Sequence, residues 1–81
     1  MNDSLAEKII AIIASVKRLP VERVSLESSF EELGLDSLDA MNILFELEQE
    51  FSISIPDRQA RAIRTVRDAV EGVRMLLPAG A

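Results

Sequence analysis

Apolar residues recur along this chain at the spacing of α-helices. In the first segment they stand at positions i, i+4, i+7, i+8 and i+11, on one stripe of a helix: Leu5, Ile9, Ile12, Ile13 and Val16. The pair Leu19-Pro20 ends this helix, because a residue before proline is biased out of the helical region. The sequence therefore predicts a helix from Leu5 to about Leu19.

Residues 20–35 do not continue this periodicity. Pro20, several serines and Gly34 alternate with apolar side chains, so the segment reads as a long loop whose apolar residues are pinned over the helices. A short helical turn is expected near Phe30–Leu33.

A second helix is predicted from Asp36-Ser37 to about Phe51. Asp36 can cap it, and Asp39, three residues later, lies in the first turn, where the helix dipole favours a carboxylate. One group of apolar residues forms a face that can be buried: Ile43, Leu44, Leu47 and Phe51. A second stripe comprises Leu38, Met41 and Phe45. This stripe either packs in the core or forms an exposed apolar patch ringed by acids, which marks an interaction site.

The remaining chain predicts two more helices. A short one follows Pro56-Asp57, from Arg58 to about Ile63. Thr65, with Asp68 three residues on, forms a capping-box pattern that opens a last helix, which contains Gly72 and ends before Pro78. We expect an all-α fold, a small antiparallel four-helix bundle with three main helices and a short third helix, in a single domain over residues 1–81 with 78–81 as a flexible tail.

The composition narrows the possible functions. The 81 residues include no Cys and no His, which excludes a thiolate nucleophile, a Ser-His-Asp triad and a zinc site built on these residues. We therefore expect no enzyme activity and no bound metal. No apolar run approaches the roughly 20 residues that span a bilayer, so we expect no membrane insertion. Separately from this observation, we expect a monomer and a cytoplasmic location.

Charge is distributed unevenly. The net charge of −5 includes eight acidic and no basic residues between positions 30 and 57, and five Arg with only two acids after position 57. An acidic block repels phosphates, which argues against a nucleic-acid partner, and it attracts a basic protein surface. The alternative is a solvated face that keeps the protein in solution.

Candidate chemistry centres on Gly34-Leu35-Asp36-Ser37-Leu38. Ser37 is expected in the first turn of the second helix, where free N–H groups and the helix dipole suit a phosphate ester. By itself, a serine in this place is most often an ordinary helix-start residue. A hydrolase serine does not fit, because no glycine stands two residues after Ser37 and no His can activate its hydroxyl.

The stretch Leu33–Asp39 closely resembles the phosphopantetheine attachment motif of acyl carrier proteins. The order around it matches as well, with Glu48-Gln49-Glu50-Phe51 and then Ile53-Ser54-Ile55-Pro56-Asp57, and the similarity extends from about Leu5 to Leu77. The resemblance implies that Ser37, beside Asp36, carries 4′-phosphopantetheine, whose thiol holds acyl groups as thioesters. The missing Cys agrees with this, because the family takes its thiol from that group.

The same resemblance implies partners and residue roles. A holo-synthase or another phosphopantetheinyl transferase would modify the protein from coenzyme A. Ketosynthases, acyltransferases or acyl ligases of fatty-acid, lipid or polyketide-type biosynthesis, with basic docking surfaces, would receive the acyl group. Partner contacts are expected at acidic and apolar positions of the second helix: Asp36, Leu38, Asp39, Met41, Phe45 and Glu48. The acyl chain is expected in a pocket formed by Ile43, Leu47, Ile55, Ala60 and Ile63.

Some features leave alternatives open. Housekeeping members of the family usually have an acidic third helix, whereas here it carries Arg58, Arg61 and Arg64. These arginines either balance the acidic second helix or mark a specialised, free-standing carrier. Asn42 and Phe45 also differ from the residues such carriers often have. Two other functions remain: a small non-catalytic helical adaptor in which Ser37 is only structural, and a peptidyl, aryl or D-alanyl carrier.

Overall fold

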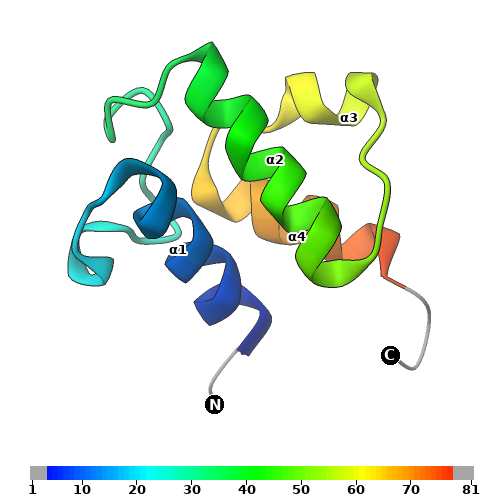
Figure 1. The fold of residues 1–81 in the computed structure, drawn as a ribbon, viewed down its shortest axis with the longest axis horizontal. Coiled ribbons are helices and arrows are strands. Elements are labelled where there is room, and N and C mark those ends of the chain that lie inside the picture. Colours follow the sequence, from blue (N-terminus) through cyan, green and yellow to red (C-terminus); the bar gives the residue numbers. More distant parts are fainter. Residues whose placement is uncertain (1–3, 78–81) are drawn as a thin grey trace.

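The part of the chain that the structure describes folds into helices that pack against one another, with no sheet among them (Figure 1). The computed structural model describes residues 4–77, and within that range the elements in chain order are α1 (Ser4–Lys17), the 3-10 helix η1 (Val21–Arg23), α2 (Ser37–Phe51), α3 (Asp57–Ala62) and α4 (Val66–Leu76). The expected all-α bundle of three main helices and one short helix is confirmed. The expected flexible tail, residues 78–81, lies outside the described residues.

Three helices supply the centre of the core. Its fully buried larger side chains come in pairs from α1, α2 and α4: Ile9, Ile13, Ile43, Leu47, Val66 and Val73. Each such side chain stabilises the fold by roughly 1.5–3 kcal/mol relative to an exposed one. Within residues 4–77 no polar side chain is buried, and no helix there is long and apolar enough to cross a bilayer.

Helix α1 ends two residues earlier than expected. Arg18 adopts the left-handed conformation with φ 58°, and the Leu19 N–H donates to the Ala14 carbonyl at 2.8 Å. The helix therefore ends at this left-handed residue and not at the residue before the proline. The chain then forms η1, which the apolar pattern does not predict. The expected short turn near Phe30–Leu33 is present, since the Leu33 N–H donates to the Ser29 carbonyl at 3.2 Å, which is the bond of a single helical turn.

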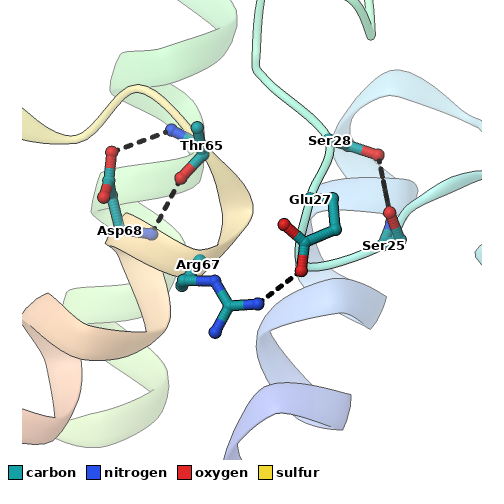
Figure 2. Close-up of polar contacts among 6 residues, drawn as sticks. All are labelled: Ser25, Glu27, Ser28, Thr65, Arg67 and Asp68. Atoms are coloured by element: carbon teal, nitrogen blue, oxygen red, sulfur yellow. Dashed lines mark hydrogen bonds and ion pairs between the residues drawn. The ribbon is translucent and has the colours of Figure 1, made fainter.

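The apolar residues of the long loop pin it over the helices, as expected, with Val24 and Phe30 buried in the core. The loop backbone is also joined to the start of α4. Backbone hydrogen bonds join Phe30 N–H to the Arg64 carbonyl at 2.9 Å and Val66 N–H to the Ser28 carbonyl at 3.0 Å. Figure 2 shows the polar side chains at this junction, with the ion pair between Arg67 and Glu27 linking α4 to the loop. These contacts hold the loop in place ahead of α2.

Helix α4 begins with the predicted capping box. The Asp68 N–H donates to the Thr65 hydroxyl at 3.0 Å, and the Thr65 N–H donates to the Asp68 carboxylate at 3.2 Å (Figure 2). Two N–H groups that the first helical turn would leave without partners are satisfied in this way.

The short helix α3 lies against α4 at Gly72. The Gln59 side-chain amide donates to the Gly72 carbonyl at 3.1 Å, and a Cβ at position 72 would stand only 3.2 Å from the Gln59 nitrogen. The absence of a side chain at Gly72 therefore permits this contact between α3 and α4. Ile63, directly after α3, is buried in the core and faces the same glycine, with its Cδ1 at 3.6 Å from that Cβ position.

Candidate functional site

Ser37 is the first residue of α2, and the residues on either side of it fix that helix start. The Asp39 N–H donates to Asp36 Oδ1 at 2.8 Å, and the Asp36 N–H donates to Asp39 Oδ2 at 3.3 Å. Asp36 therefore caps α2 as predicted, and with Asp39 it forms a reciprocal capping box. Because the box spans Ser37 and Leu38, the position of Ser37 is set by hydrogen bonds on both sides of it.

Gly34 shapes the approach to this site. Its φ of 77° lies in the left-handed region, which costs a residue with a side chain roughly 1–2 kcal/mol. The Gly34 N–H donates to the Glu31 carbonyl at 3.0 Å, and the next residue, Leu35, donates to the Phe30 carbonyl at 3.0 Å. The chain thus turns sharply off the pinned loop and leads directly into the Asp36 cap.

A lysine from α1 completes the surroundings of the helix start. Lys17 Nζ lies 3.3 Å from Asp39 Oδ2. The hydrogen bond from the Asp36 backbone N–H, aided by this ammonium, lowers the pKa of the Asp39 carboxyl below its ordinary value. The carboxylate is therefore ionised at neutral pH, and its charge is balanced by Lys17.

The Ser37 side chain itself is exposed. Within residues 4–77 no hydrogen bond engages its hydroxyl, and no group of three or more His, Cys, Asp or Glu side chains is arranged to hold a metal ion. The hydroxyl is thus accessible to a second protein.

The second apolar stripe of α2 is exposed. Leu38, Met41 and Phe45 are 66%, 65% and 58% exposed, whereas Ile43 and Leu47 on the opposite side are fully buried. This removes the alternative that the stripe completes the core. We call these three residues the α2 ridge. They form an apolar surface that begins next to Ser37 and continues down the helix.

Two of the acids expected to contact partners are engaged within the molecule. Glu48 Oε2 accepts a hydrogen bond from the Ile55 N–H at 2.7 Å, and Asp39 is held by Asp36 and Lys17. Both side chains are half-buried, whereas Asp36, Glu46 and Glu50 are exposed. Glu48 therefore holds the segment between α2 and α3, a role that its sequence position does not reveal.

The expected pocket residues fall into two groups. Ile55 and Ala60 are half-buried and line a groove of about 280 Å³ between α2 and the segment that contains α3. The other residues lining this groove are Met41, Leu44, Phe45, Glu48 and Asp57. Ile43, Leu47 and Ile63 belong to the closed core and do not line it. The structure thus places the outer pocket residues beside the α2 ridge and the inner ones in the core.

A second groove lies on the other side of Phe45. It has a volume of about 480 Å³ between α1 and α2, and its lining residues are Ala11, Ile12, Ser15, Val16, Asn42, Phe45 and Glu46. Sequence reasoning missed this groove, because it depends on how α1 and α2 pack and not on the pattern within either helix. Phe45 contributes to both grooves.

Comparison with known proteins agrees with this arrangement. The family model described as "Phosphopantetheine attachment site" matches residues 7–73. Over 73 residues the chain is 41% identical to an acyl carrier protein of Treponema denticola, covering 89% of this chain and 94% of that protein. It is 37% identical to an acyl carrier protein of Rickettsia bellii, covering 89% and 85% respectively.

Solved structures show the same fold. The crystal structure of an acyl carrier protein from Thermotoga maritima superposes with a TM-score of 0.78 at 32% identity, covering 90% of this chain and 86% of that one. The solution structure of an apo doublet acyl carrier protein from prodigiosin biosynthesis gives a TM-score of 0.80 at 24% identity. The match covers 96% of this chain and 38% of the doublet, and at that identity it speaks for the fold alone.

Proposed function

Because the chain belongs to the acyl carrier proteins, whose prosthetic group is 4′-phosphopantetheine, we propose that Ser37 is the residue that bears this group through a phosphodiester. The observation that carries the proposal is the position of Ser37. It is an exposed serine at the first position of α2, held by the capping box of Asp36 and Asp39, with a hydroxyl that no neighbour engages within residues 4–77.

The surroundings of Ser37 fit a phosphodiester. The first N–H groups of a helix have no intrahelical partner, and together with the helix dipole they favour an anion. Asp36 already satisfies the N–H of Asp39, which leaves those of Ser37 and Leu38 for a phosphate oxygen. Lys17 balances the Asp39 carboxylate, so the negative charge already present beside Ser37 is reduced.

The chain's own contribution is to present Ser37 and not to catalyse. When bound, the prosthetic group supplies a thiol that holds an acyl group as a thioester. The sequence contains no Cys or His that could supply a thiol or a proton shuttle of its own. We infer that the protein is a non-catalytic carrier, which an external transferase using coenzyme A must modify.

The groove between α2 and α3 is the proposed entrance for the acyl chain. Ile55 and Ala60 line it, and the apolar side chains of Met41 and Phe45 extend it toward Ser37's end of α2. Because Ile43 and Leu47 are fully buried, an acyl chain that goes deeper has to displace core contacts. Burial of the apolar acyl chain favours deeper insertion, whereas the loss of packing between core side chains opposes it.

Partners are proposed to dock on the α2 ridge and the acids beside it. A phosphopantetheinyl transferase must reach Ser37, and enzymes such as ketosynthases, acyltransferases or acyl ligases must reach the thiol at the far end of the arm attached there. Asp36 is exposed and offers its charge to basic partners. Asp39 and Glu48 can also attract basic partners, but their carboxylates are already bonded to Lys17 and to the Ile55 N–H. A cytoplasmic location and a role in fatty-acid, lipid or polyketide-type biosynthesis belong to the same proposal.

Thiol titration tests the attachment directly. Because the chain has no Cys, the purified protein should show no thiol. After incubation with coenzyme A, Mg²⁺ and a promiscuous phosphopantetheinyl transferase, followed by removal of small molecules, we expect one thiol per chain.

The Ser37→Ala variant should remain at zero while its helical circular dichroism is unchanged. A wild-type protein that stays without a thiol, when a known carrier in the same mixture gains one, would favour a helical adaptor in which Ser37 is only structural.

A further inference from the structure

Helix α3 presents one face to the protein and another to solvent. Its inner side is defined by contacts, since Gln59 bonds to α4 at Gly72, Ala60 lines the groove toward α2, and Ile63 is buried. Arg58 and Arg61, which are three residues apart, are both exposed. Arg64 is also exposed and lies two residues after the end of the helix. These three arginines form what we call the α3 basic surface.

Within residues 4–77, no ion pair involves the charges of the α3 basic surface. In the part of the chain that the structure describes, the two ion pairs are those of Lys17 with Asp39 and of Arg67 with Glu27. Neither involves Arg58, Arg61 or Arg64, although acidic α2 lies just across the groove. Direct pairing with α2 therefore does not explain why the chain carries arginines here.

The α3 basic surface adjoins the proposed docking helix. Met41 and Phe45 of the α2 ridge line the same groove as Asp57 and Ala60 of α3. Figure 1 shows α3 beside α2, so that the two helices border one side of the molecule. A protein that covers the α2 ridge and also spans the groove reaches α3 and its exposed arginines. Its side chains there meet positive charge, whereas those above α2 meet negative charge.

We propose that Arg58, Arg61 and Arg64 select partner enzymes whose docking face carries acidic side chains opposite α3 beside basic side chains opposite α2. This inference rests on the proposed carrier function. Opposite charges across an interface raise the association rate, and like charges exclude the wrong partner. A docking face that is basic throughout satisfies α2 but is repelled at α3. The negative charge of α2 and the positive charge of α3 together determine which partners bind.

A pair of matched charge reversals tests this surface. Arg61→Glu changes the α3 basic surface, and Arg23→Glu makes the same change in η1, at the other end of the molecule from α3 (Figure 1). The probe is a phosphopantetheinyl transferase whose docking face is basic throughout, and the readouts are its KM and its Kd for the unmodified protein. We expect Arg61→Glu to lower KM and Kd each by roughly fivefold, which is the largest effect usual for one exposed charge contact.

The control decides whether the effect is local. Arg23→Glu should change KM and Kd much less than Arg61→Glu. Equal effects of the two variants would show that only net charge matters, and an unchanged or raised Kd for Arg61→Glu would place α3 outside the docking area. Either result overturns the proposal.

A charge swap on the transferase provides the second arm. Replacing its basic side chain opposite α3 by Glu should tighten binding of the wild type and weaken binding of Arg61→Glu; the absence of this reversal overturns the proposal. Wild-type self-association that Arg61→Glu abolishes would assign the surface to a second copy and also overturn it. At saturating transferase every variant should still gain the prosthetic group, which separates a failure here from a failure of the Ser37 assignment.

Discussion

The Lys17 ammonium lies 3.3 Å from the Asp39 carboxylate and joins the last residue of α1 to the first turn of α2. The same carboxylate oxygen accepts the hydrogen bond from the Asp36 N–H that completes the capping box. One side chain therefore connects the cap, the packing of two helices and the surroundings of Ser37. Changes at Asp39 should be felt in stability as well as in attachment.

Removing the charge of Asp39 should change how stability depends on pH. The Asp36 N–H and Lys17 hold the pKa of Asp39 below its ordinary value of about 4. A carboxyl whose pKa is lowered by folding stabilises the protein above its unfolded pKa, and this contribution is lost as pH falls through the folded pKa. Asp39→Asn should therefore be less stable than the wild type at pH 7, with the difference shrinking as pH falls below about 4 and disappearing once pH is below the folded-state pKa. Urea unfolding between pH 2.5 and 7 measures this, and a constant difference over that range would contradict it.

Removing either capping box should lower the free energy of unfolding by a similar amount, but only one of the two changes should affect function. Asp36→Ala and Thr65→Ala each remove an N-cap, which costs about 1 kcal/mol. Only Asp36 adjoins Ser37, so only Asp36→Ala should slow attachment of the prosthetic group. Urea unfolding and the initial rate of attachment measure the two effects. Similar attachment rates for the two variants would show that the cap of α2 has no part in presenting Ser37.

The two sides of α2 should respond in opposite ways to truncation. Leu47 is fully buried, so Leu47→Ala should cost 2–5 kcal/mol of the free energy of unfolding, the usual range for a core leucine. Phe45 is mostly exposed, so Phe45→Ala should change stability by less than about 1 kcal/mol while weakening binding to a transferase. Chemical denaturation and isothermal titration measure the pair. A large stability loss for Phe45→Ala would assign the α2 ridge to the fold.

Glu48 should act as a strap for the segment between α2 and α3. Its carboxylate accepts the Ile55 N–H at 2.7 Å, so Glu48→Ala should speed hydrogen exchange of that amide. Glu48→Gln keeps a side-chain oxygen in reach and should restore most of the protection. If Glu48→Gln and Glu48→Ala exchange equally fast, the charge of Glu48 and not the hydrogen bond is what holds the segment.

Local signals in the sequence were sufficient for several elements. The Asp36 cap, the end of α2 at Phe51 and the Thr65 cap of α4 were all predictable, because each depends on residues within a few positions of one another. The 3-10 helix after Pro20 was not, since Val21–Arg23 has no apolar period of its own.

Contacts between distant residues escaped sequence reasoning for a different reason. The pair of Lys17 and Asp39 depends on the left-handed ending of α1 at Arg18 and on how α1 packs against α2. Helical spacing separates the α2 ridge from the buried side of α2, but it does not show which of the two stripes has neighbours. The packing of α1 and α4 leaves the ridge uncovered, as the family resemblance implied and as helical spacing alone could not decide.

Intact mass measurement tests the central claim most directly. Wild type, Ser37→Ala and the control Ser54→Ala, which changes another exposed serine, are each incubated with coenzyme A, Mg²⁺ and a promiscuous phosphopantetheinyl transferase. The wild type and Ser54→Ala should each gain the mass of one 4′-phosphopantetheine group, and Ser37→Ala should gain none. A gain that persists in Ser37→Ala would contradict the assignment of Ser37, and so would a wild type left unmodified beside a known carrier that is fully converted.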